Sequence, residues 1–301
     1  PAGAACRIRA VKWRGRRAAR LDCAAYGLEE RQRREPRMSW WAVPRGWIES
    51  FGDLARFTVR CFGEVYGGRV FRFFGEALRQ AGLLILSSTL VIWGLVFIIG
   101  LQCGIEGAYF TRGTGTPNYA GVFTAWCDLR ELVPYAFGYM MAAKVGTGIV
   151  AEIGSMRITE EIDALEVMGI SSMTFLCGTR LLASWMVLPF VYIGGVGAAF
   201  IASYLAVVVQ IHEVSSGGYE LIFWAFQNPT DLLYSLLKGA FMATGIVIVG
   251  CYYGYNASGG PVGVGTATAK SMVLNLVYVH LIGMMGTQLF WGANPRAPIG
   301  G

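Results

Sequence analysis

The chain has 301 residues, of which 54% are hydrophobic and 15% are charged, whereas an ordinary soluble domain carries about 25% charged residues. Its formal net charge of +6 is unevenly placed: residues 1–80 hold 17 Lys or Arg against 8 Asp or Glu, and the remaining residues hold 8 against 11. This composition excludes an ordinary soluble globular domain. A basic arm suits nucleic acid or an anionic membrane surface, and because the body is apolar we expect the membrane and no nucleic-acid partner.

The first 37 residues are rich in Arg, Ala and Gly and lack the continuous apolar stretch of a secretory signal peptide. The run from Glu29 to Arg37 is nearly all charged, so we expect residues 1–37 to be disordered. A second hypothesis is that Met38 is the natural start and that residues 1–37 are a non-native extension. N-terminal sequencing of the native protein would test it.

Residues 38–80 form a basic segment with helical periodicity. Its polar and apolar positions separate onto two helical faces: Asp53, Arg56, Arg60, Glu64, Gly68, Arg72, Glu76 and Arg79 on one, and Phe62, Val65, Tyr66, Val70, Phe73, Phe74 and Ala77 on the other. This pattern predicts an amphipathic helix that lies in the membrane interface, with a break at Gly67-Gly68.

Five later segments are apolar and long enough to cross a bilayer, whose hydrocarbon core of ~30 Å needs about 20 helical residues. The predicted membrane domain covers residues 81–292, a short tail covers 293–301, and the spans lie at about 81–104, 132–151, 181–208, 232–254 and 271–292. Small residues four apart, as at Gly195, Ala199 and Ser203, predict close packing between helices.

The positive-inside tendency places the basic N-terminus in the cytoplasm. Five spans then make the C-terminus extracytoplasmic and the loops 152–180 and 255–270 cytoplasmic. The outer loop 212–231 has no Lys or Arg, which agrees, whereas the outer loop 106–131 holds two Arg against three acids, which is a weak counter-signal. We therefore expect a multi-pass protein of the bacterial plasma (inner) membrane.

The cysteines leave one covalent question open. Cys103 and Cys127 flank an outer loop and can form a disulfide if that loop faces an oxidising side, although buried free thiols are the commoner case.

The loop 152–180 contains the most informative segment. Thr159 is a suitable N-cap and Gly169 is placed to end a helix between them. At about ten residues this helix is too short to span a membrane. Acids in its first turn suit the helix dipole, and an apolar stripe runs beside them: Glu160, Glu161 and Asp163, then Ile162, Leu165 and Met168. This combination suits docking into a groove on a soluble partner, and equally a solvated loop helix.

From Glu152 to Gly169 the chain resembles the signature of the MlaE/YrbE family of ABC-transporter permeases, E-I-G-x-M-[RK]-x-[ST]-E-[EQ] followed by D-A-[LM] and M-[GA]. Supporting fragments are Leu129–Pro134, Asn228–Leu232 and Gly254–Ala257, and the similarity covers about residues 50–292. It looks nearest to the YrbE branch that serves Mce (mammalian cell entry) systems, with features of its B-type subunit. The fold class this implies is all-α and integral to the membrane: an N-terminal interfacial helix, five transmembrane helices and a short cytoplasmic coupling helix between the second and third.

The resemblance implies a permease subunit of an ABC-type lipid transporter of the Mce/Mla kind. The implied partners are ABC ATPase subunits, a second homologous but non-identical permease subunit, Mce-domain substrate-binding proteins and the lipid itself. ATP hydrolysis is then expected in a separate chain, so this chain is expected to be no enzyme and to bind no cofactor. The implied ATPase-coupling residues are Glu152, Arg157, Thr159, Glu160, Glu161, Asp163, Leu165, Glu166, Met168 and Gly169.

Lys144 lies near the middle of the second span, where an unpaired charge costs ~2.5 kcal/mol or more. Two interpretations stay open: it lines a lipid cavity and holds an anionic headgroup, or it pairs with Glu131 or Glu152. The family commonly has a basic residue here, which favours the cavity, and Glu131 is a second candidate for that cavity. Lys238 near the outer boundary is predicted to snorkel, and His280 to serve packing.

Two rival classes predict other patterns. An ion-coupled secondary transporter of a hydrophobic substrate needs acids within the membrane and often has internal repeats. A membrane-embedded lipid enzyme needs a nucleophile or a metal cluster, and the seven Cys contain no C-x-x-C pair. The segment Gly265–Ser271 resembles a phosphate-binding loop but lacks both required glycines. The sequence therefore favours the transporter permease.

Overall fold

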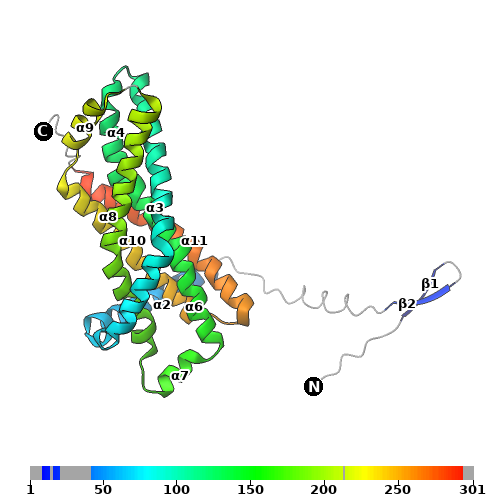
Figure 1. The fold of residues 1–301 in the computed structure, drawn as a ribbon. Helices are drawn as coiled ribbons and strands as arrows, with labels where there is room; N and C mark the ends of the chain where they lie inside the picture. The colour runs from blue at the N-terminus through cyan, green and yellow to red at the C-terminus, as the bar shows by residue number, and fades with distance from the viewer. Residues whose placement is uncertain (1–8, 14–15, 21–41, 213, 294–301) are drawn as a thin grey trace. The chain divides into compact units, whose positions relative to one another are not determined.

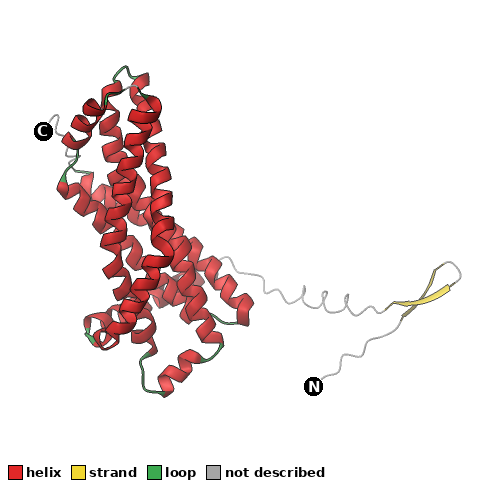
Figure 2. Cartoon of the chain, in the orientation of Figure 1, coloured by secondary structure: helices red, strands yellow, loops and turns green. Residues whose placement is uncertain are grey.

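The computed structural model describes residues 9–13, 16–20, 42–212 and 214–293. The chain divides into two units, Pro1–Ala55 and Arg56–Gly301. In the first unit, strands β1 (Arg9–Trp13) and β2 (Arg16–Arg20) pair antiparallel, with Arg9 opposite Arg20 (Figure 2).

This hairpin corrects the expectation of disorder for residues 9–13 and 16–20. The expectation rested on side-chain composition, whereas the backbone hydrogen bonds of an antiparallel pair are available to every non-proline residue. The rest of segment 1–37 lies outside the described residues, and the predicted start at Met38 stays a prediction.

From residue 42 onward the described chain is helical (Figure 1). The first helices are α2 (Ala42–Tyr66), which crosses the boundary between the units, the 3₁₀ helix η1 (Arg69–Phe73) and α3 (Phe74–Gly113). The predicted break at Gly67-Gly68 is confirmed: Gly68 has φ 73°, a left-handed conformation that glycine adopts without steric cost.

A continuous helical run follows from residue 120 to residue 158. Its segments are α4 (Ala120–Trp126), the π-helix η3 (Cys127–Leu132), α5 (Val133–Met140), the π-helix η4 (Met141–Gly146) and α6 (Thr147–Ile158), preceded by the short η2 (Pro117–Tyr119). A short helix α7 (Glu161–Val167) comes next.

The second half of the chain contains three long helical segments. They are η5 (Met173–Gly178) with α8 (Thr179–Tyr204) and η6 (Leu205–Ile211), then α10 (Pro229–Tyr255), and finally α11 (Gly260–Trp291). The short α9 (Ser216–Ala225) precedes α10, whose N-cap Asn228 accepts a hydrogen bond from the amide of Thr230 at 3.0 Å.

Four helical segments of the described chain are long and apolar enough to cross a membrane: Arg69–Gly113, Met173–Ile211, Pro229–Tyr255 and Gly260–Trp291. Four of the five predicted spans fall on them. The fifth prediction, residues 132–151, lies in the run 120–158, which is not among the four; Lys144, two Tyr and three Gly make this stretch more polar.

Two boundaries differ from the prediction. Residues 255–270 were expected to be a loop, but α11 begins at Gly260, so only a short turn separates it from α10. The Gly- and Thr-rich sequence gave no apolar signal, yet Pro261 in the first turn suits a helix start. In addition, α3 is 40 residues long, about 60 Å, and so exceeds the ~30 Å hydrocarbon core.

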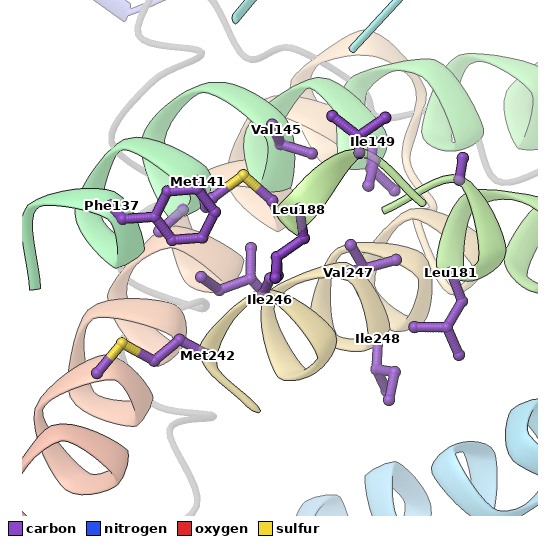
Figure 3. Packing of buried hydrophobic residues seen from close by; sticks show 14 of the residues in the cluster. Phe137, Met141, Val145, Ile149, Leu181, Leu188, Met242, Ile246, Val247 and Ile248 are labelled. Carbon is purple, nitrogen blue, oxygen red and sulfur yellow. The ribbon is translucent and has the colours of Figure 1, made fainter. Parts of the chain in front are cut away.

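The core of the second unit lies where α5, η4, α6, α8 and α10 meet (Figure 3). Helix α3 packs along α8 through the predicted small residues: a Cβ added to Gly100 would lie 2.6 Å from the carbonyl oxygen of Ala199, and one added to Gly104 would lie 2.9 Å from that of Ser203. The predicted close packing at Ala199 and Ser203 is therefore confirmed. A second, smaller core joins α4, α9 and η6 at the opposite end of the unit from α7.

Candidate functional site

The segment Glu152–Gly169 is divided between two helices. Glu152 and Arg157 lie in the last turns of α6, and α7 begins only at Glu161. The prediction that Thr159 is the N-cap is wrong: its hydroxyl donates to the carbonyl of Ser155 at 3.0 Å and so closes α6, while Glu160 with φ 63° occupies the N-cap position. Ser and Thr side chains compete in this way for backbone partners of a preceding turn.

Gly169 ends α7 as predicted. Its φ is 76°, its amide donates to the carbonyl of Glu166 at 2.9 Å, and the amide of Ile170 donates to that of Leu165 at 3.0 Å. The predicted apolar docking stripe, in contrast, is only partly available. Ile162 is fully buried in the chain's own core and Leu165 is half-buried.

The large apolar side chains exposed on α7 and its C-cap are Val167 and Met168, at 88% and 66%. The carboxylates of Glu160 and Glu161 are exposed nearby. The free surface of α7 therefore combines two apolar side chains with acids, which suits a protein contact.

Polar contacts anchor α7 to α6, to α10 and to Ser172 at the start of η5. Arg157 pairs with Asp163 at 2.7 Å, which joins α6 to α7. Glu166 accepts hydrogen bonds from Ser172 at 2.7 Å and from Tyr255, the last residue of α10, at 3.2 Å. A displacement of α7 would therefore act on α6 and α10 through these contacts.

A further ion pair involves α6, more than two turns before α7 begins. Glu152 pairs with the buried Arg180 of α8 at 2.7 Å, which ties α6 to α8.

Helix α2 packs on the same end of the unit. The rings of Phe57 and Tyr252 meet edge to face with centroids 5.5 Å apart, and Thr174 donates to Glu64 at 2.8 Å. Phe57, Cys61 and Val65, four residues apart, are its buried positions after Arg56. Burial, followed by the neighbouring Cys251 and Glu64, raises the pKa of the Cys61 thiol to about 12, so it stays protonated at neutral pH.

Lys144 is exposed and makes no hydrogen bond or ion pair among the described residues. Both acids that were candidates to neutralise it are paired elsewhere, Glu131 with Lys238 and Glu152 with Arg180. The interpretation of Lys144 as an internal ion pair is therefore wrong, and its charge is turned outward from the helical unit.

Lys238 is also misassigned by the sequence. It is 1% exposed, so it does not snorkel, and its ammonium donates to Glu131 at 3.2 Å, to the carbonyl of Arg130 at 2.9 Å and to Thr287 at 2.6 Å. The hydroxyl of Thr287 donates in turn to Glu131 at 2.6 Å. Glu131 thus links η3 to α10 and α11.

Comparison with known proteins identifies the family. A model of the family described as Permease MlaE matches residues 77–289. A probable ABC transporter permease protein of Rickettsia bellii is 32% identical over 81% of this chain and 93% of its own length. The chain belongs to the MlaE permease family.

More distant members have more specific names. The intermembrane phospholipid transport system permease protein MlaE of Haemophilus influenzae is 26% identical over 82% of this chain and 95% of its own length. The protein Trigalactosyldiacylglycerol 1, chloroplastic, of Arabidopsis thaliana is 25% identical over 71% of this chain and 58% of its own length. The family resemblance found in the sequence is thus confirmed, and with the apolar helices it makes this chain an integral membrane permease.

The MlaE-type fold of this chain contains a second buried ion pair that the sequence did not reveal. Arg130 donates to Asp231 at 2.7 Å and 3.2 Å, and Asp231 also accepts from the indole of Trp291 at 3.0 Å. Arg130 lies within the fragment Leu129–Pro134 and Asp231 within Asn228–Leu232. Both fragments resemble the family signature, and this resemblance was the one sign in the sequence that Arg130 and Asp231 have a role.

The same end of the permease carries a covalent link. Cys103 of α3 and Cys127 of η3 form a disulfide, which settles the question that the sequence left open. Among the described residues there is no group of three or more His, Cys, Asp or Glu side chains placed to hold a metal ion.

Proposed function

We propose that this chain is the membrane permease subunit of an ABC-type lipid transporter of the Mce/Mla kind, and that α7 couples it to a separate ATPase. The observation that carries the proposal is the anchoring of α7: its outer surface is exposed, while its polar contacts lead to α6 and α10. ATP binding and hydrolysis belong to the partner chain, and this chain binds no cofactor and catalyses no reaction.

The orientation follows from the same assignment. The α7 end and the N-terminus face the cytoplasm, and the end with the disulfide and the C-terminus faces outward, where an oxidising compartment favours the Cys103–Cys127 bond. The run 120–158 is the fifth crossing, because it connects α4 at the outer end with α7 at the cytoplasmic end (Figure 1). Helix α2 after the basic arm lies in the interface of a bacterial plasma membrane.

The lipid pathway is proposed to lie along the face that carries Lys144. A polar pair is also exposed on the membrane-spanning helices: Tyr139 of α5 and His280 of α11 are hydrogen-bonded to each other at 3.0 Å. Exposing a charge and a polar pair to lipid tails inside the hydrocarbon core costs free energy. We therefore propose that the Lys144 face is covered by a second, homologous permease subunit or lines a polar cavity. Lys144 then holds the anionic headgroup of the lipid, and Mce-domain proteins continue the path outside. Glu131, whose side chain is 38% exposed, lies at the outer end of this path.

Co-purification tests the coupling. The double variant Val167→Asp/Met168→Asp changes only exposed side chains, so the permease is expected to insert and fold while its retention of the ATPase subunit falls at least tenfold, as about 1.4 kcal/mol of lost contact requires. The matched control is Glu106→Lys/Glu220→Lys, two exposed positions at the other end of the unit, which is expected to retain the ATPase. Full ATPase retention by the α7 variant would overturn the coupling role.

A further inference from the structure

A cavity of about 840 Å³ opens beside α7, apart from the Lys144 face. Its walls come from the last turns of α2, from η1, from the segment after α7 and from the end of α10. Its charged side chains are Arg60, Glu64, Arg69 and Glu166, and Ser171, Ser172 and Tyr255 add hydroxyl groups. Its volume falls within the ~300–1,000 Å³ typical of small-molecule sites.

The cavity is lined by two Arg and two Glu side chains, and not all of them are engaged in ion pairs. Arg69 pairs with Glu64 at 2.9 Å, and Thr174 donates to the other oxygen of the same carboxylate at 2.8 Å. Glu166 receives both of its hydrogen bonds on Oε1, which leaves Oε2 open. Arg60 makes no hydrogen bond or ion pair within the part of the chain that the structure describes. One free guanidinium and one half-used carboxylate therefore line the same space.

Apolar side chains next to the cavity set its depth in the membrane. Val59, Tyr66 and Phe71 are 72%, 79% and 61% exposed. They belong to α2 and η1, two of the segments that form the cavity wall. Apolar faces of interfacial helices sit at the boundary between headgroups and acyl chains. The cavity would then lie at headgroup depth.

We infer that this cavity binds the headgroup of a zwitterionic phospholipid that carries a primary ammonium group. The phosphate accepts hydrogen bonds from the fork of Arg60, which matches a phosphate in two-point geometry, and the ammonium donates to the open oxygen of Glu166. The lipid is a resident bridge between α2 and the segment after α7, not the transported molecule. The inference rests on the proposed interfacial position of α2 and not on coupling to the ATPase.

Native mass spectrometry of the delipidated permease complex, titrated with phosphatidylethanolamine or phosphatidylglycerol, tests the inference. The variant Arg60→Gln is expected to bind phosphatidylethanolamine about tenfold more weakly, since a charged hydrogen bond is lost. The matched control Arg72→Gln removes the same charge from an exposed position of η1 that does not line the cavity, and it is expected to bind as the unchanged protein does.

The ammonium has its own test. The unchanged protein is expected to prefer phosphatidylethanolamine to phosphatidylglycerol, which has no ammonium, and Glu166→Gln is expected to abolish that preference. Equal loss in the Arg60 and Arg72 variants, or phosphatidylglycerol binding as tight as phosphatidylethanolamine binding, would overturn the site. So would an Arg60 variant that keeps the lipid and loses the ATPase, because the cavity would then be a protein contact. Loss of lipid with the ATPase retained leaves the coupling proposal untouched.

Discussion

The two ends of the helical unit are held together by different kinds of contact. At the α9 end, the ion pairs of Arg130 with Asp231 and of Lys238 with Glu131 each have at least one fully buried partner, and a disulfide joins α3 to η3. At the α7 end, the pair of Arg157 with Asp163, which holds α7 itself, is partly exposed on both sides, whereas the pair of Glu152 with the buried Arg180 joins α6 to α8 and does not include α7. Buried charges are costly to separate, whereas exposed pairs contribute little.

This difference suggests how the permease divides its work. The α9 end fixes the relative positions of η3, α10 and α11, because breaking either of its ion pairs would leave a charge uncompensated in a low-dielectric environment. The ion pair that joins α7 to α6 costs little to rearrange, which is what a segment that transmits a partner's movement requires. Stability and movement are thus assigned to opposite ends of the same helices.

The largest expected effect is at Asp231. Asp231→Ala removes the buried carboxylate that pairs with the Arg130 guanidinium, so the free energy of unfolding is expected to fall by about 3–5 kcal/mol. The matched control Asp163→Ala breaks the exposed pair at the α7 end, where a loss of no more than about 1 kcal/mol is expected. Unfolding of both variants in detergent by denaturant titration measures the difference. Equal losses would remove the contrast between the two ends.

A smaller effect is expected where α3 meets α8. In Gly100→Val the new side chain meets the backbone of Ala199, so the helices must separate, at a cost of about 1–3 kcal/mol. Gly94→Val is the control on the same helix, because a Cβ there has open space around it. Thermal unfolding in detergent compares the two, and an unchanged melting temperature for Gly100→Val would contradict the close approach.

The smallest effect at neutral pH concerns Cys61, because its titration changes the stability only at alkaline pH. Its pKa is raised from 9.0 to about 12, so the folded state holds the proton more tightly than the unfolded state does. The resulting stabilisation is complete below pH 9.0 and is lost as the pH rises toward 12. We expect the unchanged protein to lose more stability over this window than Cys61→Ala does. Maleimide labelling of Cys61 in the folded protein, followed by peptide mass spectrometry, should stay slow at pH 9.

The sequence predicted the helices of this fold better than the contacts between them. Apolar length alone located four spans, and glycine chemistry located the breaks at Gly68 and Gly169. The N-cap at Thr159 was wrong because the local pattern cannot tell whether a hydroxyl turns forward or back. Arg130 and Asp231 are 101 residues apart, so no local periodicity could pair them. Lys238 and its partner Glu131 are 107 residues apart, so their pairing could not be predicted from the local sequence either.

The family signature was informative for a related reason. The segment Glu152–Gly169 is short, contiguous and polar, so its residues could be recognised together before any tertiary contact was known. What it could not show is which side chains remain exposed: Ile162 is buried, and Val167, which was not among the predicted residues, is the most exposed large apolar side chain of α7.

Site-specific photo-crosslinking in the assembled transporter tests the central claim most directly. A photoreactive amino acid is placed at Val167 of α7 and, as the matched position, at Leu221 of α9, which is 74% exposed at the other end. The account predicts that the ATPase subunit is captured from position 167 and not from position 221. Capture from 221, or from neither position in a complex that still hydrolyses ATP, would contradict it.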